Sequence, residues 1–279
     1  MKIPLISVIV PSFRSGKSIS FLFDSILEQS FKNFEIIVAD GGSDDDTLEI
    51  IEKYKSSFKN MIVNSEKDEG IYDAINKGVS LANGKWIYII GTDDRIFDKD
   101  VFLHFSEMEN KVNERLIYGN VQVVGDAGWA RDGQIYVGSF DNSKLLIKNI
   151  CQQAVFYHYL LFKKYGMFEK RYKVCSDWDF LLRVVSHEPI KYIDLTVARF
   201  YGGGTSVSRM DEAFQAEFIR NLYKYFGRRL KSSEFYSLRH KIHDLAGEFY
   251  RSGKRISAYK CNRIYKWLDE HPPNIRDSV

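Results

Sequence analysis

Residues 85–95, with the sequence KWIYIIGTDDR, contain the pattern that decides the fold. Residues 86–90 are a short and almost continuous apolar run, which is typical of a strand buried on both faces of a parallel sheet. The run stops at Gly91, and two adjacent carboxylates, Asp93 and Asp94, follow it. Ligands of open α/β sheets bind beyond the carboxyl ends of the strands, where carboxylates suit a divalent cation that holds a diphosphate. A loop or a helix cap is an equally good reading of the two residues alone.

Upstream of this stretch, apolar runs alternate with segments of helical spacing. This alternation predicts right-handed βαβ units and a parallel sheet. Pro11 is expected to end the first strand, because proline cannot donate to a sheet ladder. The predicted strands are residues 6–10, 34–39, 61–64 and 86–90, and the predicted helices are residues 15–29, 47–54 and 69–81.

Downstream of Asp94, the regular alternation of predicted strands and helices ends. A glycine run at residues 202–204 then leads into a helical tail, so the expected seam lies near residues 202–208. The sequence therefore predicts a domain over residues 1–208 and a helical extension over residues 209–279. The expected helices are residues 101–108, 159–165 and 177–186, and the expected strands are residues 116–124, 134–138, 190–193 and 197–201.

The composition predicts a globular intracellular protein. The chain has 279 residues, of which 44% are hydrophobic, and no segment approaches the run of roughly 20 apolar residues that spans a bilayer. The N-terminus enters a strand pattern directly, without the features of a signal peptide. The three cysteines form neither a close-spaced metal pair nor a disulfide framework, which favours a reducing cytoplasm.

The formal charge of +3 is distributed unevenly. Residues 209–279 carry 15 Lys and Arg against 9 Asp and Glu, a balance of 15 − 9 = +6, which leaves 25 − 28 = −3 for residues 1–208. A basic tail with interspersed aromatic residues fits nucleic acid, an anionic membrane surface or a solvated helical face. The basic residues are spread out and no nucleic-acid motif accompanies them, which favours the solvated face and argues against nucleic acid.

A second polar stretch follows the strand predicted at residues 34–39. Asp40 can accept a hydrogen bond from a base or a ribose, and the glycines after it allow a ligand to approach the backbone closely. Residues 43–47 can also cap the next helix. The stretch is not a Gly-x-Gly-x-x-Gly loop, and the chain has no Walker phosphate loop, which argues against a dehydrogenase and a P-loop kinase.

Two further stretches carry acidic residues near predicted helix starts. A helix that begins near residue 69 directs free N–H groups toward the sheet edge, while Asp73 and Lys77 have the spacing of a surface ion pair. Asp177 is either an N-cap or a general base for a hydroxyl, and Trp178 either stacks on a sugar or fills the core. Residues 151–153 either line an acceptor pocket or form a core strand.

Taken in order, these stretches resemble the inverting family 2 glycosyltransferases with a GT-A fold, over about residues 5–208. SVIVPSF (7–13) resembles the family's first strand, DGGSDDDT (40–47) its nucleotide-binding turn, IGTDD (90–94) its Asp-x-Asp metal site, and SDWD (176–179) its acceptor-side acidic motif. Residues 66–78, EKDEGIYDAINKG, are similar to the branch found in bacterial O-antigen, capsule and colanic-acid gene clusters.

The resemblance implies a GT-A α/β fold, with a mostly parallel sheet, a nucleotide-sugar half over about residues 1–95 and an acceptor half over about residues 96–208. It implies that Asp177 is the catalytic base and that Asp93, with Asp94, binds Mn²⁺ or Mg²⁺. The substrate-binding residues that it implies are Pro11, Ser12, Phe13, Asp40, Gly41, Asp44, Asp68, Gly70, Tyr72, Asn76, Lys77, Thr92, Asp93 and Trp178. Two positions depart from the family pattern: Gly91 replaces the first acid of Asp-x-Asp, and Ile75 replaces an arginine near the diphosphate, whose charge Lys77 is a candidate to supply.

The implied reaction moves a sugar, with inversion, from a nucleotide-diphosphate sugar, with UDP-sugars favoured, to a glycan acceptor. By analogy with the family, the acceptor is an oligosaccharide on undecaprenyl diphosphate, in surface-polysaccharide biosynthesis such as that of lipopolysaccharide. The basic tail then has a use in peripheral contact with the cytoplasmic face of the inner membrane. The alternatives are a sugar-nucleotide pyrophosphorylase, whose glycine-rich basic loop is missing from residues 12–17, and a non-catalytic scaffold.

Overall fold

The computed structural model describes residues 3–272 apart from 126, 129, 137 and 203–210, and the side chains of residues 142 and 143 are also outside the description. The chain forms two compact units, one of residues 1–139 with 149–211 and one of residues 140–148 with 212–279. The expected seam at residues 202–208 lies almost wholly outside the described residues. Within the described part, no helix is long and apolar enough to cross a membrane.

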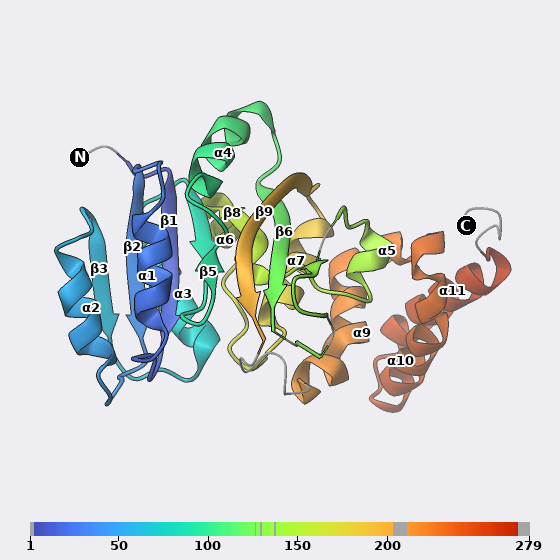
Figure 1. Cartoon of the computed structure of the whole chain (residues 1–279). Coiled ribbons are helices and arrows are strands. Elements are labelled where there is room, and N and C mark those ends of the chain that lie inside the picture. Colours follow the sequence, from blue (N-terminus) through green and yellow to red (C-terminus); the bar gives the residue numbers. More distant parts are fainter. Residues whose placement is uncertain (1–2, 126, 129, 137, 203–210, 273–279) are drawn as a thin grey trace. The chain divides into compact units, whose positions relative to one another are not determined.

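The first unit is built on one mixed sheet (Figure 1). Its strand order is β3-β2-β1-β4-β8-β6-β9-β5, and β7 pairs with β6. β1 to β4 are parallel, as expected, and β6 is parallel to β9, whereas β8 is antiparallel to both of its neighbours. The strands are β1 (Ile6–Ser12), β2 (Phe34–Asp40), β3 (Met61–Ser65), β4 (Trp86–Ile89), β5 (Arg95–Ile96), β6 (Leu116–Val124), β7 (Ile135–Tyr136), β8 (Val155–His158) and β9 (Lys191–Tyr201).

Both faces of the parallel strands are covered by helices. Alternate residues of β1, such as Val8, belong to the core cluster that contains the apolar face of α1, whereas Ile9 and Ile37 contact α3 on the other face at Gly78. A Cβ at Gly78 would lie 2.6 Å from Ile9 Cγ2, so glycine allows this helix to approach the sheet closely. The helices are α1 (Ile19–Leu27), α2 (Thr47–Lys55), α3 (Ile71–Leu81), α4 (Val101–Met108), α6 (Tyr159–Tyr165) and α7 (Ser176–Val185).

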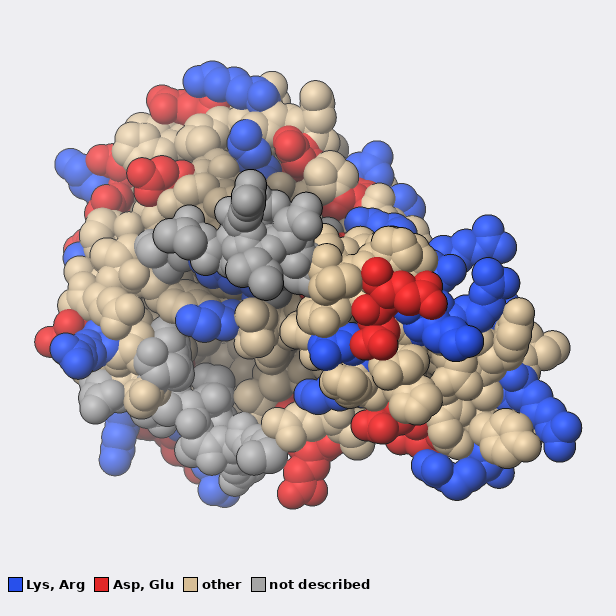
Figure 2. Space-filling view, turned by 90° about the vertical axis from the view of Figure 1, so that its right-hand side faces the viewer, with Lys and Arg blue, Asp and Glu red and all other residues tan. Residues whose placement is uncertain are grey.

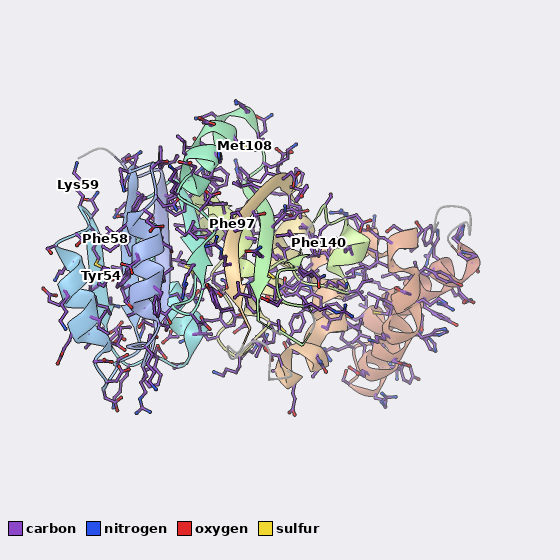
Figure 3. The ribbon with its side chains drawn as sticks, in the orientation of Figure 1. Tyr54, Phe58, Lys59, Phe97, Met108 and Phe140 are labelled. Carbon is purple, nitrogen blue, oxygen red and sulfur yellow. The ribbon has the colours of Figure 1, made fainter. Side chains whose placement is uncertain are left out.

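Aromatic side chains join α1 to α2 on the outer part of this unit. The ring of Phe23 lies 5.2 Å from that of Tyr54 and 5.7 Å from that of Phe58, centroid to centroid (Figure 3). The Tyr54 hydroxyl also donates to Asp24 at 2.7 Å. These contacts fix the two helices that follow β1 and β2, and therefore the loops that precede those helices.

The first strand is longer than predicted, because Pro11 lies inside β1. Ile90 N donates to Ile9 O, so the backbone groups of Ile9 point toward β4, and those of Pro11, two residues later, point the same way. β4 pairs with β1 only as far as Ile9, so the missing N–H of Pro11 removes no ladder bond. The strand therefore carries Ser12 to the sheet edge.

The two strands predicted at residues 190–193 and 197–201 are in fact one strand, β9. Its pairing with β6 shifts register on both sides of Asn120, and such a bulge interrupts the alternation of side chains. At this point a Cβ on Gly119 would lie 2.2 Å from Leu195 O. Residues 151–153 are not a strand either: Gln152–Ala154 form the 3₁₀ helix η2, and β8 follows it.

The second unit is helical. It contains α5 (Asn142–Leu145), α9 (Glu212–Phe226), α10 (Arg239–Arg251) and α11 (Arg255–Glu270), with the short 3₁₀ helices η3 (Gly227–Leu230) and η4 (Ser233–Leu238). α10 and α11 pack on each other, and the turn between them includes Gly253 with a positive φ of 76°. The buried apolar residues of this unit include Phe140, Leu145, Leu222, Phe226, Phe235, Ile242, Leu245, Phe249, Cys261, Ile264 and Leu268.

Candidate active site

The parallel strands β1, β2 and β4 bring three of the predicted stretches to one edge of the sheet. Because their carboxyl ends coincide, Ser12 and Asp40 are paired neighbours in the β1–β2 register, and the loop after β4 begins beside them. The Thr92 hydroxyl in that loop donates to Ser15 Oγ at 2.9 Å, which ties the β4 loop to the β1 loop. Ser12, Asp40 and the start of the β4 loop therefore lie at one edge of the sheet, while their roles toward a donor stay predictions.

The buried carboxylate of Asp177 lies in the first turn of α7. The helix begins one residue earlier than predicted, so Cys175 is the N-cap position and Asp177 is not an N-cap. Asp211 Oδ2 instead accepts from the backbone N–H groups of Val174 and Cys175, at 2.8 and 3.0 Å, and so fixes the chain that enters the helix. The helix start is thus held by another residue, which leaves the Asp177 carboxylate for other contacts.

Two side chains from distant segments hold the Asp177 carboxylate. The Tyr72 hydroxyl lies 2.9 Å from Oδ1, and Asn149 Nδ2 donates to Oδ2 at 2.8 Å. Burial raises the pKa of the Asp177 carboxyl to about 6, although the hydrogen bonds from Tyr72 and Asn149 act to lower it. A carboxylate with a pKa near neutrality is suited to accept a proton from a hydroxyl.

The Tyr72 hydroxyl has a second acceptor. It lies 2.7 Å from Val174 O, as well as close to Asp177, and its single proton can go to only one of them at a time. Burial and the negative charge of Asp177 raise the pKa of Tyr72 well above its usual value. The phenol therefore stays protonated and acts as a hydrogen-bond donor at this position.

The two acids after β4 have different environments. Asp94 is buried, and its carboxylate accepts from Gln153 Nε2 at 2.9 Å and from the backbone N–H of Tyr201 at 3.0 Å. Burial and the charge of Asp93 raise the pKa of Asp94 well above its usual value. Asp93 is exposed, and no hydrogen bond or ion pair of its carboxylate is recorded within the described residues.

These environments bear on metal binding. Among the described residues no group of three or more His, Cys, Asp or Glu side chains is arranged to hold a metal ion. A cation held by one or two carboxylates together with substrate phosphates does not need such a cluster. Asp93 fits that role as an available carboxylate, whereas both oxygens of Asp94 already accept hydrogen bonds. A Cβ at Gly91 would lie 2.9 Å from Asp93 Oδ1, so the glycine leaves space for this carboxylate.

Cys151 lies between β7 and β8 and is half-buried. Desolvation, with the negative charges of Asp94 and Asp177, raises the pKa of its thiol above the usual value. Several buried side-chain polar atoms of the first unit have no hydrogen-bond partner within the described part. They include Ser12 Oγ, Asn149 Oδ1, Gln152 Nε2, Tyr157 Oη and Ser176 Oγ.

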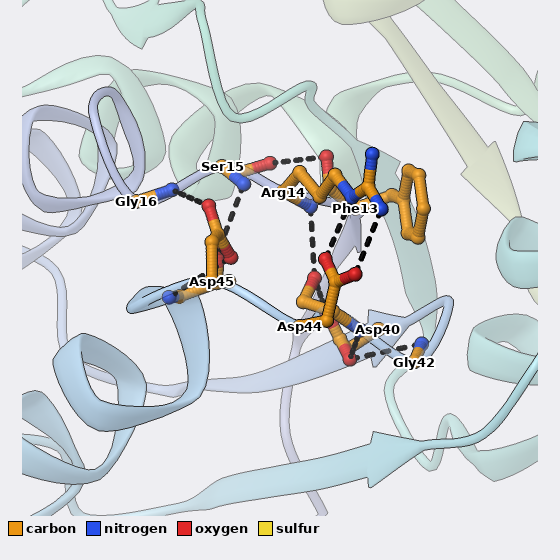
Figure 4. Close-up of polar contacts among 10 residues, drawn as sticks. Phe13, Arg14, Ser15, Gly16, Asp40, Gly42, Asp44 and Asp45 are labelled. Carbon is orange, nitrogen blue, oxygen red and sulfur yellow. Dashed lines mark hydrogen bonds and ion pairs between the residues drawn. The ribbon is translucent and has the colours of Figure 1, made fainter.

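The turn after β2 is a closed network of hydrogen bonds (Figure 4). Asp40 is buried, and its carboxylate accepts from the N–H groups of Gly42 and Ser43 and from the hydroxyls of Ser43 and Ser65. The carboxylate of Asp68 lies against Gly41, where a Cβ would be 2.3 Å from its Oδ2. The structure thus gives Asp40 an internal role in shaping the turn, and its contact with a base stays a prediction.

Asp44 pairs with a residue that the sequence did not single out. Arg14 donates to both Asp44 oxygens at 2.7 Å, and its backbone N–H donates to Ser43 Oγ (Figure 4). Both side chains are exposed to solvent. The backbone φ of Arg14 is positive, at 49°. The exposed ring of Phe13 lies 5.2 Å from Arg14 Cζ. This bidentate pair joins the β1 and β2 loops.

The predicted residues at the start of α3 are largely bound to other parts of the protein. Asn76 exchanges two hydrogen bonds with the backbone of Phe168, at 2.8 and 3.0 Å. Lys77 donates to Lys67 O and forms ion pairs with Glu66 and, as predicted, with Asp73 at 3.4 Å. Ile75 is buried, so its side chain does not reach the solvent.

The remaining predicted residues flank these contacts. Asp68 accepts from the N–H of Gly70, which has a φ of 125° at the N-cap position of α3. Asp179 and Arg183 form the predicted pair at 3.0 Å, and Trp178 between Asp177 and Asp179 is half-buried. The roles of Pro11, Ser12, Phe13, Gly41, Asp44, Asp68, Gly70, Tyr72, Asn76, Lys77, Thr92 and Trp178 in substrate binding stay predictions.

The sequence missed Asn149, and for Gln153 it offered only an acceptor-pocket or core-strand role as part of residues 151–153. Asn149 contacts Asp177, which is 28 residues away in the sequence, and Gln153 contacts Asp94, which is 59 residues away. No short-range spacing in the sequence indicates these contacts. The amide side chains of Asn149, Gln152 and Gln153, close together between apolar segments, were the available signal.

The architecture and the acidic edge together define a class of protein. A mixed α/β sheet, with an acidic loop after β4 and a buried carboxylate at the start of α7, is the GT-A type of glycosyltransferase fold. The profile of the family described as glycosyl transferase family 2 matches residues 7–173. The chain belongs to glycosyl transferase family 2.

Related sequences agree with this assignment. A PGL/p-HBAD biosynthesis glycosyltransferase of Mycobacterium bovis (strain BCG / Pasteur 1173P2) is 34% identical over 222 residues, which cover 77% of this chain and 84% of the relative. Chondroitin synthase of Escherichia coli is 23% identical over 217 residues, which cover 75% of this chain but only 31% of that protein.

Solved structures confirm the fold. S. aureus TarS 1-349 in complex with UDP-GlcNAc has a TM-score of 0.62 at 18% identity, and the match covers 95% of this chain and 90% of that one. The mannosyltransferase PcManGT from Pyrobaculum calidifontis, in complex with GDP-Man and Mn²⁺, has a TM-score of 0.57 at 16% identity, and covers 82% and 65%.

Proposed function

We propose that this family 2 glycosyltransferase moves a sugar, with inversion and with a divalent metal, from a nucleotide-diphosphate sugar to a glycan acceptor. UDP-sugars are the favoured donors. The observation that carries the proposal is the buried Asp177 carboxylate, with a pKa of about 6, held by Tyr72 and Asn149 at the edge where the donor-side loops meet.

In the proposed reaction, Asp177 is the general base. The acceptor hydroxyl oxygen attacks the anomeric carbon and forms the new C–O bond, while its proton passes to the Asp177 carboxylate. The bond from the anomeric carbon to the diphosphate breaks at the same time, and its electron pair leaves with the diphosphate. Because Tyr72 and Asn149 hold both carboxylate oxygens, the base is oriented before the acceptor arrives.

Asp93 is the proposed metal-binding residue, with Asp94 as its support. A bound Mn²⁺ or Mg²⁺ would supply charge stabilisation to the leaving diphosphate. The exposed Asp93 carboxylate is available for such a cation. Asp94 acts by holding the loop: its hydrogen bonds to Gln153 and to the Tyr201 backbone fix the position of the adjacent residue.

The acceptor and the pathway are the least constrained part of the proposal. We assign the protein to bacterial surface-polysaccharide biosynthesis, of the O-antigen, capsule or exopolysaccharide type, with an acceptor linked to undecaprenyl diphosphate. Relatives whose names refer to PGL/p-HBAD biosynthesis and to chondroitin synthesis support a glycan or glycolipid acceptor. The protein would then work in the cytoplasm, in peripheral contact with the inner membrane.

The competing functions each lack a structural feature that they require. A sugar-nucleotide pyrophosphorylase needs a glycine-rich basic loop after the first strand, whereas residues 12–17 contain one glycine, and Arg14 of this segment is paired with Asp44. A non-catalytic scaffold has no use for the buried carboxylate at Asp177, which destabilises the fold when ionised.

A thermal-shift screen tests the donor class. The purified protein is heated with UDP, GDP, CMP or TDP, each with and without Mn²⁺, and with uridine as a control that lacks the diphosphate. A ligand at 100 times its dissociation constant stabilises the native state by about 2.7 kcal/mol. We expect a Mn²⁺-dependent shift with UDP and none with uridine. No shift with any nucleotide would favour the scaffold, and an equal shift without metal would contradict the metal requirement.

The phenol of Tyr72 gives a prediction about pH. Its hydrogen bond stabilises the Asp177 carboxylate, so Tyr72→Phe should raise the pKa of Asp177 further above 6, by about one unit. Since the ionised carboxylate is the active form, the acidic limb of the kcat–pH profile should move upward. We expect about a threefold loss of kcat at pH 6.5, a loss that approaches tenfold below pH 5, and a near recovery above pH 8.

The kcat–pH profile distinguishes a raised pKa of Asp177 from a structural defect as the cause of a slower variant. A purely structural defect would lower kcat by the same factor at every pH. The control is Tyr165→Phe, which removes a tyrosine hydroxyl bonded to Glu188 at 2.9 Å and should leave the acidic limb where it was. An unchanged limb for Tyr72→Phe would remove Tyr72 from the mechanism.

A further inference from the structure

The turn between α10 and α11 exposes large apolar side chains. Tyr250 is 64% exposed, Ile256 is 74% exposed and Tyr259 is 62% exposed. All three come from ten consecutive residues, and five exposed cations lie among and just beyond them. We call this set the basic-aromatic surface; it consists of Tyr250, Arg251, Lys254, Arg255, Ile256, Tyr259, Lys260 and Arg263.

Helical geometry places most of this surface on one side of α11. The core side carries Ala258, Cys261, Ile264 and Leu268, all buried. Ile256, Tyr259 and Arg263 follow the i, i+3, i+7 spacing of a single helix face, and they lie away from the core side. The exposed apolar groups therefore form one outward face and are not a continuation of the core.

The cations of this surface are not neutralised by acidic neighbours. Other arginines of the same unit form ion pairs, Arg220 with Glu248 and Arg239 with Asp269. No ion pair is recorded among the described residues for the five cations of the surface. Arg255 instead lies 5.8 Å from the ring of Tyr250, and Arg263 lies 6.0 Å from the ring of Tyr259. Figure 2 shows Lys and Arg side chains among uncharged surface, with Asp and Glu side chains also present on this face.

We propose that the basic-aromatic surface docks the protein on an anionic phospholipid bilayer. Lysines and arginines contact the lipid phosphates, and Ile256 with the two tyrosine rings enters the headgroup region. Tyrosine favours this boundary, and an interfacial helix combines basic residues with an apolar face. An aliphatic side chain such as Ile256 gains nothing from a nucleic-acid backbone, which favours the bilayer over a polynucleotide. The inference rests on the membrane contact of the proposed function and names the surface that makes it, and vesicle binding tests it separately from sugar transfer.

Vesicle co-sedimentation of the full-length protein tests the proposal. The vesicles contain phosphatidylcholine with or without phosphatidylglycerol. We expect binding to the anionic vesicles only. Each cation near such a surface contributes about a fivefold gain in partitioning, so Lys254→Gln/Arg255→Gln/Arg263→Gln should lower partitioning by roughly 100-fold. Ile256→Ser/Tyr259→Ser should lower the binding that persists when salt screens the charges.

A matched control carries the same change of net charge elsewhere. Lys53, Lys59 and Lys99 are exposed on the first unit (Figure 3 labels Lys59), and Lys53→Gln/Lys59→Gln/Lys99→Gln should bind nearly as wild type. Equal losses in the two triple variants would mean that net charge alone causes binding, and would overturn the proposal. Three other results would also overturn it. The first two are wild-type vesicle binding by both surface variants, and binding of an oligonucleotide without binding of vesicles. The third is a protein that does not bind vesicles but self-associates, with the self-association abolished by Ile256→Ser/Tyr259→Ser.

Discussion

Asp177→Asn should lower kcat by about 10²- to 10⁴-fold, the usual contribution of a general base. The substituted side chain is isosteric, so the loss would reflect the missing proton acceptor. Its new amide can still accept from Asn149 through its oxygen, and its NH₂ group can donate to the Tyr72 hydroxyl, which keeps Val174 O as its own acceptor. Single-turnover sugar transfer measures the effect.

Stability measurements make the result interpretable. Burial raises the pKa of the Asp177 carboxyl from 3.8 to about 6, so its ionised form destabilises the native state above pH 6, by on the order of 3 kcal/mol. A neutral isostere removes that destabilisation. The variant should therefore unfold at the same or a higher urea concentration at pH 7.5, and should bind nucleotide as wild type does. Wild-type turnover in such a variant would show that Asp177 is not the base.

Asp93→Ala should weaken Mn²⁺-dependent nucleotide binding by on the order of 10²-fold, because loss of even an indirect support of a metal costs 10- to 100-fold. The exposed carboxylate makes no recorded contact within the described residues, so the fold should not change. Isothermal titration with UDP at fixed Mn²⁺ measures the affinity.

The control for this variant is Glu28→Ala, another exposed carboxylate. Glu28 caps the end of α1, which runs back from the carboxyl edge of the sheet, so it lies away from the β4 loop. It should leave the titration unchanged. If Asp93→Ala bound UDP and Mn²⁺ as tightly as wild type, the donor site would have to be placed elsewhere.

Local patterns predicted the first half of the molecule well. The apolar runs at β2 and β4 and the helical spacing of α1 and α3 are properties of consecutive residues, and the parallel order follows from their alternation. The i, i+4 pairs of Asp73 with Lys77 and of Asp179 with Arg183 were predictable for the same reason. Errors arose where a neighbouring strand decides the outcome. Pro11 is tolerated in β1 because β4 stops pairing before it, and β9 is continuous through a bulge that breaks its alternation.

The candidate site was only half predictable. The acids Asp93 and Asp177 stand out because they follow a strand and begin a helix. Their partners do not: Tyr72 reaches Asp177 across 105 residues of sequence, and Gln153 reaches Asp94 across 59. The Asp-x-Asp resemblance gave Asp93 the main metal role, with Asp94 as its helper. It could not predict that Asp94 is buried and bonded to Tyr201 N, whereas Asp93 is exposed.

That division between the two acids has a practical meaning for anyone who wishes to redirect the enzyme to other donors. Phe13 and other exposed residues of the same edge can be randomised at little risk to folding, whereas Asp93 is kept because the proposed metal binding depends on its carboxylate. Asp94 and Gln153 should be left untouched in such a library, because each variant there would confound altered donor choice with a displaced loop.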